Sequence, residues 1–123
     1  MFQSGMFLND QAPTISVQDL RGKELSNERF FLLDVRTEEE FRAGHLGFTG
    51  ALIPHDLLPS QTDKLPQDKN IPIYCFCRSG RRSAGATKYL RSIGYRQAYN
   101  VAGGILEWIK SGYETKSGTN SPQ

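Results

Sequence analysis

The sequence predicts a single α/β domain with a mainly parallel, five-stranded sheet and helices on both faces. Two continuous apolar runs of strand length, residues 30–35 and 71–76, are typical of parallel strands covered on both sides. Strand patterns alternate with helical patterns along the chain, which is the order that builds such a sheet. A length of 123 residues leaves room for one domain and excludes a two-domain enzyme.

The first elements are short. A strand is expected at residues 14–15, followed by a helix over residues 17–20. Ser16 suits the N-cap of that helix, because its hydroxyl can accept a backbone N–H, and Gly22 is expected to end it. The run at 30–35 should be a central strand of the sheet.

A capping box marks the next helix. Thr37 can accept a hydrogen bond from the backbone of Glu40 while the Glu40 side chain reaches back, so a helix should begin here and end before Gly44. A third short strand at residues 51–53 is stopped by the proline that follows it. The connection over 54–70 contains three prolines, and we expect a helical turn or two in it.

The second half repeats this order. The strand at 71–76 leads to a helix over residues 83–93, whose apolar side chains share one face and which Gly94 ends. A last strand at 97–101 and a helix that begins at Gly103-Gly104 complete the predicted domain.

The chain ends lie outside the predicted domain, which runs over residues 12–114. The segment from Met1 to Gly5 resembles the remnant of an expression linker, so Met6 is the expected native start and residues 1–11 form a leader. Residues 115–123 are rich in Ser, Gly, Thr, Asn and Pro without hydrophobic spacing, and we expect them to be disordered.

Composition and cysteine use narrow the class of protein. Apolar residues make up 37% and charged residues 23% of the chain, as in ordinary globular domains. No apolar run approaches the roughly 20 residues that span a bilayer, and no signal sequence opens the chain, so we expect no membrane association. The spacing of Cys75 and Cys77 on one strand disfavours a disulfide, and free thiols indicate a reducing, cytoplasmic location.

Charge is distributed unevenly although the total is only +2. Residues 69–106 hold seven Lys and Arg side chains and no Asp or Glu. Such a stretch would attract an anionic ligand, or it forms a solvated basic helix face. Nucleic-acid binding is the weakest alternative, because the cations gather around a cysteine and no aromatic platform interleaves them, and we predict no nucleic-acid partner.

The loop from Cys77 to Arg82, Cys-Arg-Ser-Gly-Arg-Arg, carries the predicted chemistry. It lies between a strand and a helix, where small residues allow backbone N–H groups to turn inward and the helix N-terminus adds partial positive charge. These amides and the three arginines would stabilise the Cys77 thiolate and lower its pKa, which makes this residue a nucleophile near neutral pH. Cys75 is interpreted as a buried apolar residue.

Together with motifs elsewhere, this loop resembles the rhodanese homology domain. The motifs occur in order over nearly the whole domain: Leu33-Asp34-Val35-Arg36, Glu40-Phe41, Gly44-His45-Leu46, Ile73 to Ser83, and Val101-Ala102-Gly103-Gly104 with Trp108. The resemblance implies a single rhodanese-like sulfurtransferase domain in which Cys77 carries a persulfide. The amides of residues 78–82 would surround the bound sulfur, so the implied substrate-binding residues are Arg78, Ser79, Gly80, Arg81 and Arg82.

Asp34 and Arg36 are implied to support the site from a neighbouring strand. We expect Asp34 to anchor the loop backbone or a loop arginine, and Arg36 to pair with a Glu of the following helix. An ordinary salt bridge at the strand end and a direct substrate role for Arg36 both stay open. The turn over residues 46–50 departs from the family pattern, and Phe48 is a candidate to face the pocket or a partner.

The implied reaction moves a sulfane sulfur from thiosulfate or a persulfide to a thiol or cyanide. Its partners would be a small sulfur-containing anion or persulfide as donor and a thiol, including one on a protein, as acceptor. No metal or organic cofactor is expected, because the cysteine spacing does not suit zinc with His45 and His55.

Two other functions compete with this prediction. One is a persulfide carrier or regulatory binding module without turnover. The other is a cysteine phosphatase, which is disfavoured because only four residues separate Cys77 from Arg82 where phosphatases have five.

Overall fold

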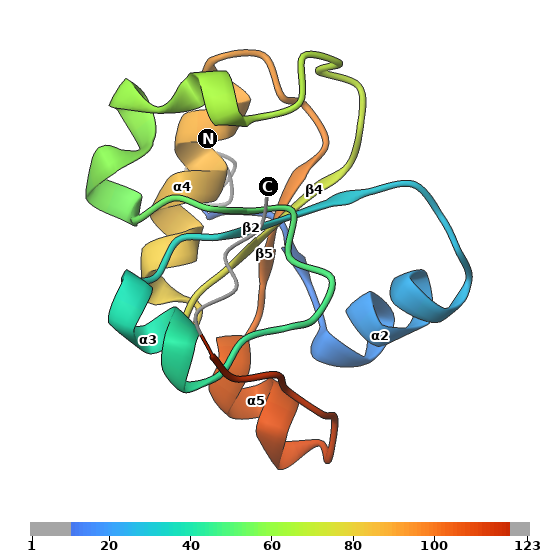
Figure 1. Ribbon diagram of the computed structural model, residues 1–123. Helices are drawn as coiled ribbons and strands as arrows, with labels where there is room; N and C mark the ends of the chain where they lie inside the picture. The colour runs from blue at the N-terminus through green and yellow to red at the C-terminus, as the bar shows by residue number, and fades with distance from the viewer. Residues whose placement is uncertain (1–10, 119–123) are drawn as a thin grey trace, which may run out of the picture.

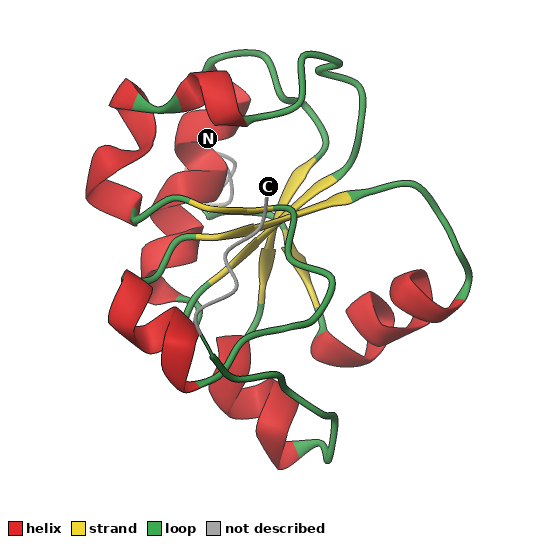
Figure 2. Cartoon of the chain, in the orientation of Figure 1, coloured by secondary structure: helices red, strands yellow, loops and turns green. Residues whose placement is uncertain are grey.

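The computed structural model describes residues 11–118, which form a five-stranded sheet with helices on both faces (Figures 1 and 2). All four strand pairings are parallel, and the strand order is β1-β5-β4-β2-β3. The predicted fold class is confirmed, with a sheet that is parallel throughout rather than mainly so. The strands are β1 (Thr14–Ile15), β2 (Phe31–Asp34), β3 (Ala51–Leu52), β4 (Ile73–Phe76) and β5 (Ala98–Val101).

Helices cover the two faces of the sheet in pairs (Figure 1). Helix α4 and the 3-10 helix η1 pack on one face, and α2 and α5 pack on the other. No helix within residues 11–118 is long and apolar enough to cross a membrane. The bounds are α2 (Val17–Leu25), α3 (Glu38–Ala43), η1 (His55–Ser60), η2 (Thr62–Lys64), α4 (Arg81–Ser92) and α5 (Gly104–Lys110).

Alternate residues of the two central strands supply two separate cores. Leu33 and Cys75 face α4 and η1, whereas Leu32, Tyr74 and Phe76 face α2 and α5. Because both faces are buried, β2 and β4 carry apolar side chains at every position except the last of β2, Asp34, which explains the long apolar runs in the sequence. The register pairs the last residues of β2 and β4, so both strands end at the same edge of the sheet.

The end of α2 and the start of α3 can be compared with the predicted helix ends. The first helix runs on through Gly22 to Leu25, so the predicted stop is wrong. No atom lies within 4 Å of a Cβ built at Gly22, and a single glycine only weakens a helix that its neighbours and the Ser16 cap sustain. The capping box of Thr37 and Glu40 is confirmed at the start of α3.

The C-terminal segment is ordered further than the sequence predicts. Lys116 and His45 exchange two backbone hydrogen bonds of 2.8 Å, and the N–H of Gly118 donates to the carbonyl of Arg42 at 2.9 Å. The end of α3 and the residue that follows Gly44 have backbone groups without partners in a helix, and residues 116–118 pair with them. The leader at residues 1–10 and the last part of the tail, 119–123, lie outside the described residues.

Phe48 faces the core and not the predicted pocket. Its ring lies edge-on to Phe30, with centroids 5.8 Å apart, and contacts Trp108 at the same centroid distance. These residues belong to the core between the sheet, α2 and α5, whereas Cys77 belongs to the core on the opposite face. Burial of the aromatic surface therefore decides the course of the altered turn.

Candidate active site

The predicted loop leaves the carboxyl end of β4 and enters α4 at Arg81. Its strand lies between β5 and β2 in a parallel sheet, so the carboxyl ends of all three strands meet at this edge. Figure 1 shows α3 and α5 at the same edge. Polar groups from four elements can therefore converge here, as is usual for sites in parallel α/β sheets.

Helix α5 sets the orientation of the loop peptides. The carbonyl of Cys77 accepts a hydrogen bond from the N–H of Ile105 at 2.9 Å, and the carbonyl of Arg78 accepts one from Leu106 at 3.1 Å. Because a trans peptide holds C=O and N–H on opposite sides, the amides that follow these carbonyls point away from α5, into the loop. A Cβ at Gly104 would collide with both carbonyl oxygens, so only glycine permits this approach.

Donors surround the sulfur of Cys77. Its Sγ lies 3.1 Å from the amide nitrogen of Gly80, 3.4 Å from that of Ser83 and 3.2 Å from the Ser83 hydroxyl. Gly80 has φ of 98°, a conformation that favours glycine and turns its N–H toward the sulfur. Of the amides predicted to face inward, that of Gly80 lies against the sulfur, and the Ser83 amide and hydroxyl add to it.

These donors outweigh the cost of burial. Cys77 is 1% exposed, and burial raises the pKa of its thiol. The Ser83 hydroxyl and the amides of Ser83, Gly80 and Ser79 lower that pKa, and their effect prevails, so it lies below its usual value. The thiolate is the reactive form of cysteine, so a lowered pKa makes Cys77 the candidate nucleophile of this hydrogen-bonded cup.

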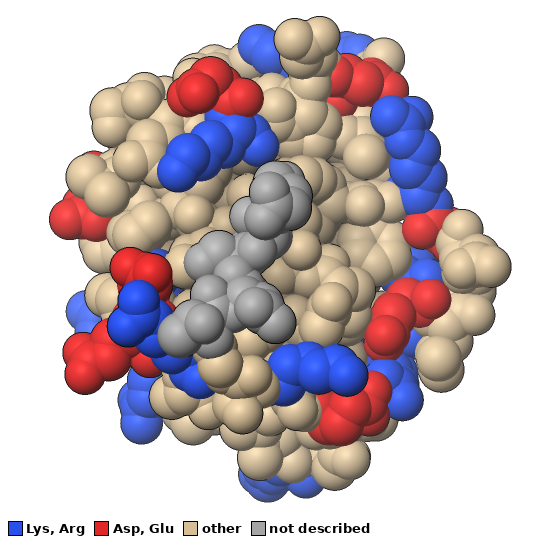
Figure 3. Space-filling model, viewed as in Figure 1, with Lys and Arg blue, Asp and Glu red and all other residues tan. Residues whose placement is uncertain are grey.

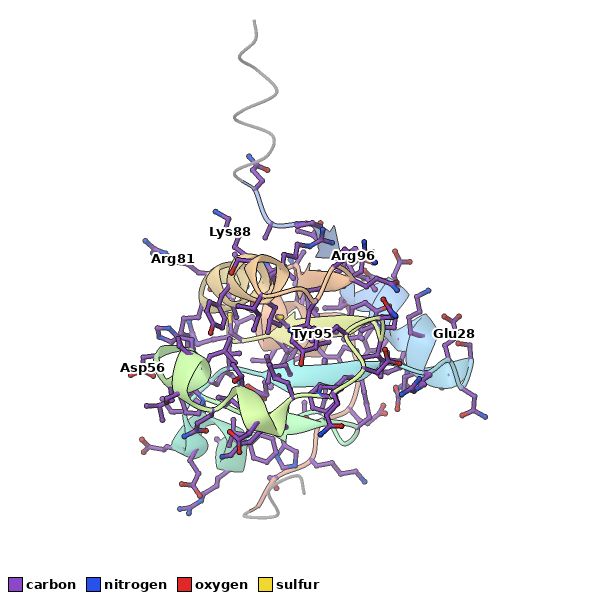
Figure 4. The ribbon with its side chains drawn as sticks, turned by 90° about the horizontal axis from the view of Figure 1, so that it is seen from above. Glu28, Asp56, Arg81, Lys88, Tyr95 and Arg96 are labelled. Atoms are coloured by element: carbon purple, nitrogen blue, oxygen red, sulfur yellow. The ribbon has the colours of Figure 1, made fainter. Side chains whose placement is uncertain are left out.

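Within residues 11–118 none of the three loop arginines donates a hydrogen bond to the Cys77 sulfur. The guanidinium of Arg82 instead makes two hydrogen bonds of 2.8 Å with the Glu40 carboxylate on α3. Arg78 and Arg81 are exposed, and in Figure 4 Arg81 points away from the body of the protein. The Ser83 hydroxyl and the backbone amides are therefore the groups in direct contact with the sulfur, and Arg82 adds a longer-range coulombic interaction with Cys77.

The basic stretch does not produce a uniformly basic surface. Lys69 donates to the carbonyl of Ile93 at 2.6 Å, and Arg91 donates to that of Ala98 at 2.8 Å. On the face seen in Figure 3, basic and acidic side chains alternate around the periphery. The exposed cations of the loop itself are Arg78, which follows Cys77 in the sequence, and Arg81, which begins α4.

The family model of the rhodanese-like domain matches residues 16–111. The chain belongs to this family. It is 36% identical over 112 residues to human thiosulfate:glutathione sulfurtransferase, covering 80% of this chain and 95% of that protein. It is 34% identical over 98 residues to a sulfurtransferase of Allochromatium vinosum, covering 80% and 89% of the two chains.

Solved structures of rhodanese-like proteins share this architecture. The human single-domain sulfurtransferase TSTD1 superposes with a TM-score of 0.70 at 33% identity, over 80% of this chain and 96% of that one. The chain also matches parts of longer proteins. It spans 50% of the putative sulfur carrier protein YrkF of Bacillus subtilis and 27% of a tRNA uridine(34) hydroxylase of Erwinia tasmaniensis. Rhodanese-type sulfur transfer is the general activity that these relatives support.

Asp34 and Arg36 of this rhodanese-like domain pair with each other. The Arg36 guanidinium donates to both Asp34 carboxylate oxygens, at 2.9 and 2.8 Å, and also to the Gly44 carbonyl at 2.8 Å. Both side chains are buried. The pair is the ordinary salt bridge at the strand end that the sequence leaves open, in place of the expected contact of Asp34 with the loop. Arg36 reaches only the main-chain carbonyl of Glu40, at 3.4 Å, because Arg82 holds the Glu40 carboxylate.

Cys75 is fully buried, and burial raises the pKa of its thiol to about 12. Its interpretation as a buried apolar residue is confirmed. His45 is buried against the Phe41 ring, with centroids 3.8 Å apart, and its Nδ1 contacts the Phe41 carbonyl at 2.8 Å. Within residues 11–118 no group of three or more His, Cys, Asp or Glu side chains could hold a metal ion.

Two residues of the site were missed from the sequence. Ser83 was placed at the start of a helix and within the family motif but given no role in the site, yet both its hydroxyl and its amide lie against Cys77. Asn100, buried in β5, accepts from the Ser83 hydroxyl and donates to the Gly80 carbonyl. A polar side chain inside an otherwise apolar parallel strand was the available signal for Asn100.

Proposed function

We propose that this domain transfers sulfane sulfur through a persulfide on Cys77. The thiolate attacks the outer sulfur of thiosulfate or of a persulfide, the S–S bond of the donor breaks, and sulfite or a thiolate leaves with the bonding electron pair. A thiol or cyanide then attacks the outer sulfur of the enzyme persulfide. This second step regenerates the Cys77 thiolate and releases a new persulfide or thiocyanate.

The ring of donors around the Cys77 sulfur carries this proposal. Amide N–H groups of Gly80 and Ser83 and the Ser83 hydroxyl lie within 3.4 Å of Sγ. Such donors stabilise an anion without a metal or a lysine, both on the attacking thiolate and on the terminal sulfur of a persulfide. Arg78, Ser79, Gly80, Arg81 and Arg82 remain the proposed substrate-binding residues, with their amides as the main contacts.

The same loop argues against phosphate ester hydrolysis. Of the loop arginines, Arg82 has the spacing from Cys77 that is most similar to that of the phosphatase arginine. Its guanidinium, however, is hydrogen-bonded to Glu40 on α3. An arginine held by a carboxylate is not free to make the two parallel hydrogen bonds that a phosphate dianion needs. A loop with four residues between cysteine and arginine also forms a smaller ring than one with five.

Intact mass after treatment with thiosulfate tests the proposal. The wild-type protein should gain one sulfur atom, and dithiothreitol should remove it. Cys77→Ser should fold but gain no sulfur, whereas Cys75→Ala, the matched control, should still be loaded. Absence of the adduct in the wild type, or its persistence in Cys77→Ser, would refute Cys77 as the sulfur carrier.

A persulfide carrier without rapid turnover is the second candidate. The likeness to the putative sulfur carrier protein YrkF of Bacillus subtilis, of which this chain spans 50%, supports it. Steady-state thiocyanate formation from thiosulfate and cyanide separates the two. Many turnovers for each protein molecule support the enzyme, and complete loading with negligible thiocyanate supports the carrier.

A further inference from the structure

Asn100 connects the loop at Gly80 to the first turn of α4 at Ser83. Its Nδ2 donates to the Gly80 carbonyl at 2.9 Å, and its Oδ1 accepts from the Ser83 hydroxyl at 2.5 Å. The residue is 7% exposed and lies on β5, the strand next to β4. Because only the NH2 group can donate to Gly80, the amide orientation is fixed and the oxygen must face Ser83.

The Ser83 hydroxyl has one proton and two acceptors within reach. Cys77 Sγ lies 3.2 Å from Ser83 Oγ, and Asn100 Oδ1 lies 2.5 Å from it on the other side. A hydroxyl can donate only one hydrogen bond at a time but can accept others. The proton must therefore lie toward the sulfur or toward the asparagine, and the charge on the sulfur decides which.

Three states of Cys77 make different demands on this proton. A neutral thiol can itself donate to Ser83 Oγ, which leaves the hydroxyl proton for Asn100. A thiolate is an acceptor only, so it draws the hydroxyl proton to itself. In a persulfide the negative charge lies on the outer sulfur and Sγ is neutral, so the proton can return to Asn100.

We propose that Asn100 is a positioning residue that competes with the Cys77 thiolate for the Ser83 proton. Ionisation of Cys77 then breaks the short Ser83–Asn100 hydrogen bond, and this cost keeps the thiolate more basic than the amides and an unopposed Ser83 hydroxyl would leave it. A more basic thiolate is a stronger nucleophile. Sulfur loading makes Sγ neutral and restores the Ser83–Asn100 hydrogen bond, which favours formation of the persulfide. This last step rests on the proposed function.

Other ionisable groups near the sulfur do not take part in this competition. Arg82 on α4 is tied to Glu40 of α3, and Asp34 at the end of β2 is tied to Arg36. Cys75, two residues earlier on β4, keeps its proton because its pKa is about 12. Within residues 11–118 none of these side chains is hydrogen-bonded to Asn100 or to the Ser83 hydroxyl.

A double-mutant cycle tests the proposal on sulfur-free protein. The Cys77 pKa is read from the pH dependence of alkylation by iodoacetamide or of thiolate absorbance. Asn100→Leu should lower this pKa by about one unit, a tenfold rise in the thiolate fraction below it, because Ser83 then serves the sulfur alone. In a Ser83→Ala background the same substitution should lower it no further.

A neighbouring buried hydroxyl provides the control. Thr87 donates to the Ser83 carbonyl at 2.8 Å and not to the sulfur of Cys77, so Thr87→Val should leave the Cys77 pKa unchanged. A rise in the pKa of Asn100→Leu, or an equal change with and without Ser83, would mean that Asn100 only holds the Gly80 carbonyl. Either result would overturn the proposal.

A measurement on the wild-type chain avoids dependence on a variant that fails to fold. The side-chain amide resonances of Asn100 should shift with pH at the apparent pKa of Cys77, because Oδ1 loses its donor there. Resonances that do not move through this range overturn the proposal. Since neither readout involves sulfur transfer, failure to gain sulfur would refute the proposed function separately.

Discussion

The guanidinium of Arg82 and the carboxylate of Glu40 meet through two parallel hydrogen bonds of 2.8 Å each. Glu40 also accepts from the backbone N–H and the hydroxyl of Thr37, as the reaching partner of the capping box. One carboxylate thus connects the start of α3 to the first turn of α4. The pair holds in place the helix that supplies the Ser83 donors to Cys77.

Glu40→Gln should change how stability depends on pH. The hydrogen bond from Arg82 lowers the pKa of Glu40 to about 2, from an ordinary value of 4.5. A lowered pKa stabilises the fold above the unfolded-state pKa, and this contribution is lost as pH falls from about 4.5 toward 2. Because the pair is partly exposed, we expect a loss of roughly 1–2 kcal/mol at pH 7 in the variant.

Urea unfolding at several pH values measures this effect. The wild type should lose that stability between pH 4.5 and 2, while Glu40→Gln should show a flatter curve in the same range. Glu39→Gln, an exposed neighbour on the same helix, should follow the wild type. Parallel curves for wild type and Glu40→Gln would show that the ion pair adds no stability.

Gly104→Ala and Gly22→Ala should act in opposite directions. A Cβ at Gly104 would meet the carbonyl oxygens of Cys77 and Arg78, and its φ of 56° disfavours any other residue. We expect a loss of about 2–4 kcal/mol and a raised Cys77 pKa, because the loop amides lose their orientation. Gly22 lies in α2 with open space around it, so alanine there should add about 0.5–1 kcal/mol.

Chemical denaturation of the two variants measures the change in the free energy of unfolding, and thiol titration measures the change in the Cys77 pKa. A Gly104→Ala protein with unchanged stability and an unchanged thiol pKa would show that α5 does not orient the loop. Gly22→Ala serves as the control that a glycine-to-alanine change in a helix is not harmful in itself.

Local patterns predicted most of the fold. The apolar runs of β2 and β4 and the Thr37 capping box depend on neighbours in the sequence, and each was placed within about two residues. The end of α2 was not predicted, because Gly22 stops a helix only where the surroundings favour a turn. The pairing of Lys116 with His45 joins segments that no local pattern connects.

The site was predicted in its backbone but not in its side chains. The loop after β4 had to place its amides near Cys77, since a strand-to-helix turn does so by its geometry. The partner of Arg82 is 42 positions away in the sequence, and that of Ser83 is 17 away. Which cation reaches which acceptor depends on how α3, α4 and β5 pack, and the sequence alone does not specify this.

Arg81→Glu should slow sulfur loading from thiosulfate. Arg81 is exposed at the start of α4 and makes no salt bridge within residues 11–118, so its charge is free to attract an anionic donor. We expect the second-order rate constant of loading to fall roughly 3–10-fold at low salt, and the difference to shrink as salt is added. The rate is measured by quenching the reaction at successive times and determining the loaded fraction from the intact mass.

Arg96→Glu is the matched control for charge. Arg96 is also exposed, but it follows the C-terminal end of α4, whereas Arg81 begins that helix, and Figure 4 shows the two side chains well apart. It should load at nearly the wild-type rate. Equal slowing in both variants would indicate a general effect of net charge, and no slowing in Arg81→Glu would show that this residue does not guide the donor.

Arg36→Met should destabilise the protein far more than it affects sulfur chemistry. Arg36 and Asp34 are 3% and 0% exposed, so removal of the cation leaves a buried carboxylate without its partner, at a cost of about 3–5 kcal/mol. Asp34→Asn in the same chain removes the unpaired charge and should recover much of that loss. Chemical unfolding of the two variants gives both values.

Sulfur loading then separates support of the strand end from contact with substrate. If Arg36 only closes the ends of β2 and α3, the double variant should gain sulfur at close to the wild-type rate once it is folded. If Arg36 binds the donor, loading should stay slow although stability has returned. Arg36→Lys, which keeps the charge but not the two parallel hydrogen bonds, provides a milder change should the methionine variant fail to fold.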